Sequence, residues 1–420
     1  MRILAVHNRY QRHGGEDVVF DAETALLERH GNEVIRFVTD NVDVDKQPRA
    51  VLALRTIWNP LTARRVRSII RAARPDVMHV HNTMPLVSPS IYSAAHEFRV
   101  PVVQTLHNFR LICPGALLLR NGVPCEDCVN TTTRWPGVVH ACYRESRAAT
   151  ATVAAMLSTH TLLGTWTNGV DRYIALSEFA KRKFVDAGWN ADQFTVQPNF
   201  LDTDPGVRPN DVGAPGTYVL FVGRVSAEKG IRTLLEAWSR FSPQVPLKIA
   251  GTGPLMPPDA SATGSVQWLG HQPRENVLAL MRGAALVVVP SECYETSPLA
   301  IIEAFAIGAP VIASRLGAMA EMVTEGDTGR LFTAGDAADL ARTLDSALRS
   351  PALMAQIAAR ARRHFDRSYT ADTHYSGLIR IYHGAIHGRR VQDTGSALRR
   401  GARSDRGIDS EQFRAGTTPR

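Results

Sequence analysis

The pattern that decides the fold lies in residues 286–305, LVVVPSECYETSPLAIIEAF. The four consecutive apolar residues at 286–289 predict a buried strand, and the loop after them leads to Pro298, which suits the first turn of a helix. The helix then continues through a largely apolar run as far as Phe305. A strand, a loop and a helix in this order form the unit of a parallel α/β sheet, in which the loop after the strand borders the binding crevice.

The same unit recurs in both directions along the chain. The apolar runs that we expect to be strands form a first series at 3–7, 33–38, 77–81, 101–106, 173–176 and 194–196, and a second at 218–222, 247–250, 266–269, 286–289 and 311–313. Helical patterns separate the runs, so each series predicts one doubly wound domain. Residues 199–216 contain three prolines and three glycines, which is typical of a linker.

These observations predict how the chain is divided. A length of 420 residues exceeds the roughly 250–300 residues that one hydrophobic core supports, so two domains are expected. We place an N-terminal domain at 1–205 and a C-terminal domain at 206–365. A helix-like segment at 366–388 is expected to cross back onto the first domain, and a polar, basic tail at 389–420 is expected to be disordered.

Charge and hydropathy argue against two classes of protein. The formal net charge is +8, but residues 389–420 hold eight arginines against four acids, so half of the excess lies in the tail and nucleic-acid binding is not favoured. No apolar run reaches the ~18 residues that a membrane-spanning helix needs. The N-terminus begins with a strand-like run and shows no signal-peptide pattern, so we expect a cytoplasmic protein.

Charged residues follow two of the predicted strands. Arg224 and Lys229 come after the run at 218–222, where a guanidinium, an ammonium and helix N-terminal amides can neutralise a diphosphate. A solvent-exposed loop with an ion pair between Arg224 and Glu228 is the alternative. In the loop and helix after 286–289, Glu295 can accept hydrogen bonds from sugar hydroxyls and Glu303 two from a ribose. Helix capping by one acid and an unrelated second acid is the alternative there.

Two acids with seven residues between them, Glu295 and Glu303, preceded by the loop Gly-Arg…Lys-Gly at 223–230, resemble the retaining glycosyltransferases of family 4. The resemblance covers about residues 1–385. It implies the GT-B fold, in which two Rossmann-like doubly wound domains face a central cleft. It also implies transfer of a sugar, with retention and without a catalytic metal or cofactor, from a UDP- or GDP-sugar to a saccharide or lipid-linked acceptor, as in cell-envelope or exopolysaccharide assembly.

The resemblance assigns roles to individual residues. Arg224 and Lys229 would contact the donor diphosphate, Glu295 the transferred sugar and Glu303 the ribose. His107, which follows a predicted strand, would lie near the transferred sugar, unless it is an ordinary core histidine; His81 is a weaker candidate for the pocket. The other residues placed around the donor are Gly14, Gly15, Glu16, Gly223, Gly251, Gly253, His271, Thr296, Ser297, Pro298 and Leu299.

Four of the five cysteines lie in one segment, residues 108–142, which resembles an insertion in a subset of bacterial family members. These four, with a two-residue spacing between the second and third, suit a tetrahedral structural zinc site: Cys113, Cys125, Cys128 and Cys142. Small buried thiols and an iron–sulfur ligand set are the competing interpretations, and His140 can replace one cysteine.

Residues 49–75 contain seven arginines and no acid, with apolar residues interleaved, and predict a basic amphipathic helix. Such a surface can lie on an anionic membrane and bring the cleft to a lipid-linked acceptor, while a solvated helix face is the alternative. A nucleotide-sugar epimerase of the same fold is the alternative enzyme. A non-catalytic sugar or nucleic-acid binder leaves the combination of Arg224, Lys229, Glu295 and Glu303 without a reason.

Overall fold

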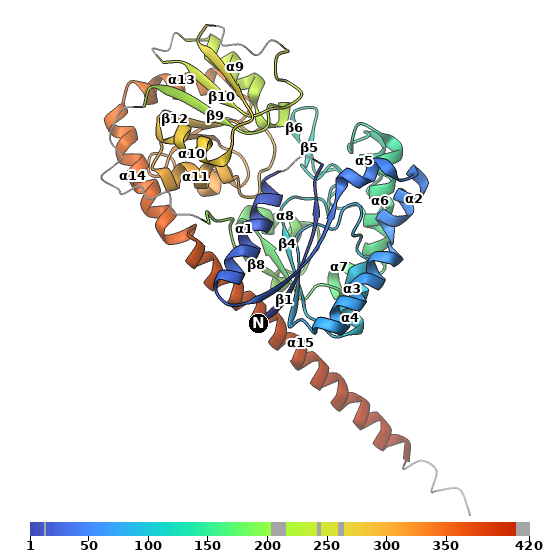
Figure 1. Cartoon of the computed structure of the whole chain (residues 1–420). Helices are drawn as coiled ribbons and strands as arrows, with labels where there is room; N and C mark the ends of the chain where they lie inside the picture. The colour runs from blue at the N-terminus through green and yellow to red at the C-terminus, as the bar shows by residue number, and fades with distance from the viewer. Residues whose placement is uncertain (12–13, 203–215, 242–244, 259–263, 409–420) are drawn as a thin grey trace, which may run out of the picture.

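The computed structural model describes residues 1–11, 14–202, 216–241, 245–258 and 264–408, without the side chains of Asp45 and of 390–408. Two lobes, each built around a parallel sheet, are joined by a long C-terminal helix (Figure 1). Most of the linker predicted at 199–216 lies outside the described residues.

The first domain contains a six-stranded parallel sheet in the order β2-β1-β3-β4-β7-β8. Its strands are β1 (Arg2–Arg9), β2 (Glu33–Asp40), β3 (Val77–Val80), β4 (Val102–Leu106), β7 (Arg172–Ala175) and β8 (Phe194–Val196). Its helices are α1 (Gly15–Arg29), α2 (Arg49–Ile57), α3 (Pro60–Ala73), α4 (Ser90–Glu97), α5 (Trp135–Val139), α6 (Arg147–Leu162), α7 (Thr165–Asn168) and α8 (Glu178–Asp186), with 3-10 turns η1 (Asn41–Lys46) and η2 (Ala191–Gln193). A short hairpin of β5 (Leu119–Arg120) and β6 (Val123–Pro124) lies within the cysteine-containing segment.

The second domain contains another six-stranded parallel sheet, in the order β11-β10-β9-β12-β13-β14. Its strands are β9 (Tyr218–Val222), β10 (Leu247–Ala250), β11 (Val266–Gly270), β12 (Ala284–Val289), β13 (Val311–Ser314) and β14 (Arg330–Phe332). Its helical segments are η4 (Ala227–Lys229), α9 (Ile231–Ser239), α10 (Arg274–Arg282), α11 (Leu299–Ile307), α12 (Met319–Met322), α13 (Ala337–Leu348) and α14 (Pro351–Ser368).

The central strands are buried on both faces because helices cover both sides of each sheet. Every residue of β3, β4 and β13 is buried. This explains why these strands read as short continuous apolar runs instead of alternating ones. The chain thus has the α/β fold with two Rossmann-like domains that the sequence predicts.

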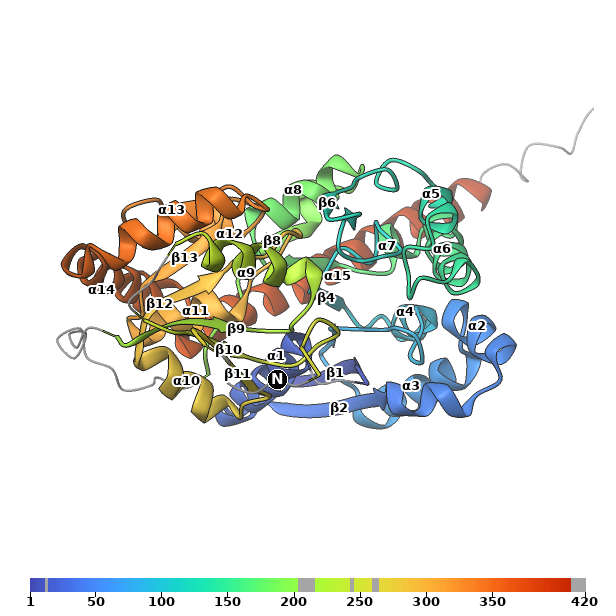
Figure 2. The ribbon, with the colours of Figure 1, turned by 90° about the horizontal axis from the view of Figure 1, so that it is seen from above.

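Helix α15 (Ala371–Ile408) leaves the second domain and packs on the first. Leu378, Ile381 and Tyr382 are buried in one cluster with Ile3 and Val103 of the first sheet. Figures 1 and 2 show α15 passing along the first lobe and projecting beyond it. Helix α15 therefore closes the first domain's core with residues from the far end of the chain.

Two segments differ from the expectations. The basic segment forms two helices, not one, because the Asn59 side chain accepts a hydrogen bond from the Thr62 amide at 3.3 Å and starts α3, with Pro60 in its first turn. The helix that begins at Ala371 continues past residue 389, where the tail was expected to be disordered, as far as Ile408. The last residues of the tail, 409–420, lie outside the described part of the chain. None of the described helices is both long and apolar enough to cross a membrane.

Candidate active site

The loops after β9 and β12 begin where the strand order of the second sheet reverses. From β9 the chain builds outward to β10 and β11, and it then returns to the other side of β9 to form β12, β13 and β14. At such a point two loops diverge and leave a crevice in which open α/β sheets bind ligands. Arg224 and Lys229 lie in the first loop, and Glu295 lies in the second.

Lys229 and Glu295 form an ion pair across this crevice. The Lys229 Nζ atom lies 2.5 Å from Glu295 Oε1, and Ser291 Oγ donates to the same oxygen at 2.8 Å. Burial acts to raise the pKa of the Glu295 carboxyl, but the charge and hydrogen bond of Lys229 outweigh it, so that pKa is lowered. Burial acts to lower the pKa of Lys229, but the charge and hydrogen bond of Glu295 outweigh this effect, so that pKa is raised. Both groups are therefore charged at neutral pH, and their side chains remain 29% and 15% exposed to a ligand.

Arg224 extends into solvent from the same loop. Its side chain is 57% exposed and pairs with Glu228 at 2.6 Å, which is the ion pair of the alternative interpretation. An exposed pair of this kind contributes about 1 kcal/mol or less to stability. Turning the guanidinium from Glu228 toward a phosphate therefore costs little free energy.

Glu303 lies within α11, two helical turns after Glu295 in the sequence. It is only 9% exposed, and burial raises the pKa of its carboxyl to about 7 despite the Arg274 guanidinium, whose Nε lies 3.8 Å from Oε1. The Arg274 Nε atom is buried and has no hydrogen-bond partner, so an unused donor lies beside the carboxylate of Glu303. His271, after β11, is exposed.

The glycines of these loops serve close packing of the backbone. A Cβ atom on Gly251 would lie 1.8 Å from the carbonyl oxygen of Gly223, and one on Gly253 would lie 2.2 Å from that of Val225. The loops after β9 and β10 can touch in this way only when both residues are glycine. The structure thus explains Gly251 and Gly253 by packing, and Gly223 by its backbone φ of +152°.

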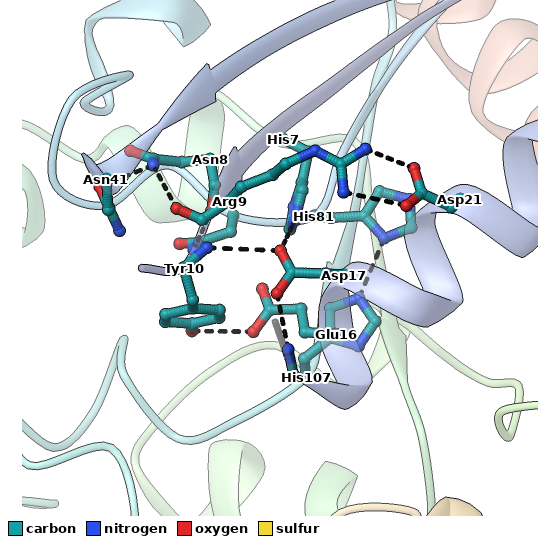
Figure 3. Close-up of polar contacts among 12 residues, drawn as sticks. His7, Asn8, Arg9, Tyr10, Glu16, Asp17, Asp21, Asn41, His81 and His107 are labelled. Carbon is teal, nitrogen blue, oxygen red and sulfur yellow. Dashed lines mark hydrogen bonds and ion pairs between the residues drawn. The ribbon is translucent and has the colours of Figure 1, made fainter. Parts of the chain in front are cut away.

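The first domain presents its own switch point, between β1 and β3. Gly14 caps α1, and Glu16 in the first turn accepts a hydrogen bond from Tyr10 Oη at 2.8 Å (Figure 3). Burial raises the pKa of the Glu16 carboxyl to about 8, so this group is largely protonated at neutral pH. A Cβ atom on Gly15 would lie 3.5 Å from Leu299 Cδ1, so this loop reaches the start of α11. Of the glycine-rich loop, His13 lies outside the described residues.

His107 belongs to a network of hydrogen bonds among buried histidines and Glu23, which the sequence did not predict. The Nε2 atom of His107 lies 3.0 Å from Nδ1 of His81, and His81 Nε2 lies 3.2 Å from Glu23 Oε1. Glu23 Oε2 is in turn 3.0 Å from Nε2 of His374 on α15. Burial lowers the pKa of His81 to about 4 and that of His107 well below its usual value, so both rings are neutral. The sequence made His81 a candidate for the pocket; the structure shows this side chain buried, at 4% exposure, and in contact with His107 (Figure 3).

The loop before α11 is bonded to the first domain. Thr296 Oγ1 donates to the carbonyl oxygen of His107 at 2.8 Å, and Asn199 Nδ2 donates to the carbonyl oxygen of Ser297 at 2.9 Å. Pro298 follows in extended conformation, and Leu299 begins the helix. The residues predicted from the two domains, His107 and the loop from Thr296 to Leu299, thus meet at one interface.

The four cysteines of the insertion line one small cavity, together with His140 and Asp127. All of them are free thiols. The sulfur atoms do not form a tight cluster of three or more. Among the described residues, one such cluster of potential metal ligands, with all atoms within 4.8 Å of one another, is found elsewhere, at Glu23, His79 and His81. Hydrogen bonds already engage both ring nitrogens of His79: Nδ1 lies 2.7 Å from Tyr382 Oη, and Nε2 lies 2.8 Å from Thr105 Oγ1.

Comparisons with known proteins match both domains to sugar-transferring enzymes. The family model Glycosyltransferase Family 4 matches residues 3–205, and the model Glycosyl transferases group 1 matches residues 209–364. The chain is 36% identical over 192 residues to D-inositol 3-phosphate glycosyltransferase of Rhodococcus erythropolis, a match that covers 41% of this chain and 42% of that protein. It is 32% identical over 245 residues to phosphatidyl-myo-inositol mannosyltransferase of Mycobacterium leprae, covering 55% of this chain and 64% of that protein. The chain thus spans about half the length of these relatives.

Solved structures share the fold over nearly the whole chain. Sucrose-phosphate synthase from Thermosynechococcus elongatus superposes with a TM-score of 0.66 at 18% identity, covering 92% of this chain and 99% of that one. The HepE protein of Anabaena, crystallised with UDP, superposes with a TM-score of 0.63 at 20% identity, covering 90% and 99%. At these identities the likeness is one of fold, and it identifies the two-domain arrangement as GT-B.

Proposed function

Because this chain joins a domain of Glycosyltransferase Family 4 to a domain of the glycosyl transferases group 1, we propose that it transfers a sugar from a nucleotide-sugar donor to an acceptor hydroxyl. The observation that carries the proposal is the Lys229–Glu295 ion pair at the switch point of the second sheet. Its two charges lie where a diphosphate and a sugar can bind side by side. The HepE structures, which hold UDP or UDP-glucose, support a UDP-sugar as donor, with a GDP-sugar as the second choice.

The residues divide the work of binding and stabilisation. Lys229, and Arg224 after it turns from Glu228, neutralise the negative charge that develops on the departing diphosphate. Glu303 accepts hydrogen bonds from the ribose, and Glu295 accepts them from hydroxyls of the transferred sugar. Lys229 thus serves two purposes, because it also holds Glu295 ionised and in place.

We propose that the transfer retains the anomeric configuration and proceeds at one face of the sugar. The bond between the anomeric carbon and the diphosphate oxygen breaks as the acceptor oxygen bonds to the same carbon. The acceptor proton passes to the departing phosphate oxygen. Glu295 is engaged by Lys229 and Ser291, which suits an acceptor of hydrogen bonds better than a nucleophile. The positive charge of Lys229 and Arg224 replaces the metal ion that other transferases use, so activity should survive a chelator.

A patch of exposed apolar side chains supports a membrane-bound acceptor. On α2 and its junction with α3, the large apolar residues Leu54, Trp58 and Leu61 are 69%, 42% and 52% exposed. The neighbouring end of α6 adds Leu162 and Leu163, at 77% and 64%, and α2 packs on α6. Residues 49–75, which include α2 and α3, also carry seven arginines and no acid. Apolar and basic side chains together fit an anionic lipid surface, and we place the enzyme at the inner face of the membrane.

Co-sedimentation with vesicles tests this surface. Vesicles of anionic phospholipid should bind the wild type at low salt, and the double variant Leu54→Asp/Trp58→Asp should bind at least about tenfold less. The exposed Leu353→Asp, on α14, serves as the matched control. Equal binding by all three proteins, or by none, would remove the membrane from the proposal.

The transfer itself is tested by product analysis. The purified protein is incubated in the presence of EDTA with UDP- or GDP-sugars and with an inositol phosphate or a polyprenyl-phosphate-linked sugar. We expect nucleoside diphosphate release that depends on the acceptor, and an anomeric proton signal in the product with the donor's configuration. Donor conversion without an acceptor would point instead to an epimerase, and an inverted anomeric centre would refute the single-face reaction.

A further inference from the structure

Four cysteines from separate turns surround one small cavity in the first domain. Its volume is about 10 Å³, which is room for about one water-sized particle. Thiol side chains come from both ends of the segment and from its centre: Cys113, Cys125, Cys128 and Cys142. His140 and Asp127 complete the polar lining.

The turns around the cavity are held close by glycines and by a backbone donor. The amide of Gly137 donates to Sγ of Cys128 at 3.2 Å. A Cβ atom on Gly115 would lie 3.2 Å from the carbonyl oxygen of Cys142, and one on Gly137 would lie 3.0 Å from Cγ of Pro114, so both glycines let these turns approach closely. The arrangement brings together sulfur atoms that the sequence separates by up to 29 positions, 113 to 142.

We propose that the four thiolates bind one structural zinc ion. We also propose that the segment 113–142, once it holds the metal, positions the loop 290–298 of the second domain, here called the donor loop. Zinc takes four sulfur ligands at about 2.3 Å, which brings neighbouring sulfurs to about 3.8 Å. The thiols turn inward about their Cα–Cβ bonds to reach that geometry, since no three of them lie within 4.8 Å of one another. Each thiol releases its proton to solvent as its bond to zinc forms.

The link to the second domain is Glu126, between Cys125 and Cys128. Its carboxylate does not line the cavity. Instead, its Oε1 atom accepts hydrogen bonds from Lys183 Nζ at 2.9 Å and from Tyr294 Oη at 3.2 Å. Tyr294 directly precedes Glu295 in the loop after β12. A loop that is fixed by zinc would thus hold Glu126, and through Tyr294 the carboxylate that faces the sugar.

Aromatic packing makes this contact specific. The Tyr294 ring lies against Phe179 and Phe109, with centroid distances of 4.8 and 6.4 Å, both in edge-to-face arrangement. Phe109 belongs to the stretch that runs from His107 to Cys113. The start of the cysteine-containing segment therefore contacts the loop after β12 in the second domain through Phe109. This second half of the inference rests on the proposed function, because it concerns nucleotide-sugar binding by the donor loop.

Metal analysis tests the first half. The full chain, purified without chelator, should contain about one zinc per chain, and an organomercurial should release it. Cys128→Ser should lose most of the zinc, while Cys293→Ser, outside the cluster, should keep it. Less than about a tenth of one zinc in the wild type, or full zinc in a folded Cys128→Ser, would overturn the site. If Cys128→Ser does not fold, mercurial titration of the wild type decides alone, because zinc release must follow modification of the four clustered thiols.

A double-mutant cycle tests the second half. Glu126→Gln and Tyr294→Phe should each keep the zinc and weaken binding of the UDP-sugar or GDP-sugar, whichever the wild type binds, by about 3- to 10-fold. The double variant should be no weaker than the worse single variant, because both changes remove one interaction. Asp186→Asn is the matched control, since Asp186 contacts the same lysine at 3.8 Å without reaching Tyr294.

Additive effects, or unchanged nucleotide-sugar affinity in both single variants, would overturn the positioning role. If the wild type binds no nucleotide-sugar, the proposed function fails and the positioning role fails with it. The zinc content then still decides the metal site on its own.

Discussion

Two carboxyls of the second domain, the half-buried Glu295 and the buried Glu303, lie in opposite electrostatic environments. Both are desolvated, but Lys229 pairs with Glu295 and lowers its pKa, while Glu303 has only a distant guanidinium and its pKa is raised to about 7. Neighbouring carboxyls with separated pKa values have different chemical roles. Here one carboxylate stays ionised over the physiological range, and the other titrates within it.

The pH dependence of nucleotide binding should follow from Glu303. Ribose hydroxyls donate hydrogen bonds, so they bind the ionised carboxylate better than the protonated form. Nucleoside diphosphate affinity should therefore rise as the pH rises through about 7. Calorimetric titrations on either side of that pH should show the rise in the wild type and not in Glu303→Gln. The same rise in both proteins would assign it to the ligand's own phosphate.

The charge of Lys229 should matter for turnover more than for folding. Replacing it with alanine removes a preorganised cation from the leaving group, which we expect to lower kcat by about 100- to 1000-fold. Lys181→Ala, on α8, is the control for loss of a lysine elsewhere. A well-folded Lys229→Ala with less than a threefold loss of kcat would contradict the diphosphate role.

The positions of single residues were predictable where charged residues directly follow a strand. Arg224, Lys229 and Glu295 lie in loops that a parallel sheet must bring together, so their sequence position was enough to predict where they lie, while their roles stay predictions. The Glu23–His81–His107 network was not predictable, because Glu23 lies in the middle of α1 and its other partner, His374, is 351 positions away. Only the packing of α15 brings these side chains together.

At the scale of elements, buried strands are the features that sequence defines best. The predicted runs 218–222 and 247–250 coincide with β9 and β10. Strand β14, three residues long at the sheet edge, was missed because it begins with an arginine and is too short for a periodic signal. The break between α2 and α3 was missed because charge and apolar spacing continue across it, while one capping side chain decides it.

Helix α15 should stabilise the first domain through its buried side chains. Leu378 is fully buried against the first sheet, so Leu378→Ala should lower the free energy of unfolding by about 2–5 kcal/mol. Arg380→Ala, on the exposed side of the same helix, should change it by less than about 0.5 kcal/mol. Urea unfolding of the two variants measures the difference. Equal values would mean that α15 does not form part of the domain's core in solution.

At the scale of the whole molecule, hydrogen bonds hold the two domains together in addition to the covalent chain. Thr296 bonds to the backbone of His107, and Glu321 accepts hydrogen bonds from the amides of Glu178 and Phe179 at 2.8 and 2.7 Å, at the start of α8. An acid at a helix N-terminus is favourable because of the unpaired amides there. The sequence predicted the two domains from their repeating units, but it contained no signal for these contacts, which depend on how the domains face each other.

Glu23 connects α1, β3 and α15, so its ionisation should affect the stability of the whole first domain. Burial acts to raise the pKa of its carboxyl, but His79, His81 and His374 outweigh it, and the pKa is well below its usual value. The stabilisation is therefore present above the unfolded pKa of about 4.5 and is lost as the pH falls through the folded value. Glu23→Gln should lower the free energy of unfolding at neutral pH and flatten its acid dependence. Urea unfolding between about pH 3 and 7 would contradict this if wild type and variant lost stability in parallel.

The most direct test of the account is the affinity of the purified chain for UDP, GDP and ADP, measured by calorimetry with EDTA present. The account predicts that one of the three binds selectively without metal, and that Glu303→Ala and Lys229→Ala each weaken this binding by about tenfold or more. Equal and weak binding of all three nucleotides, or full affinity in both variants, would contradict the claim that the crevice between β9 and β12 is the donor site.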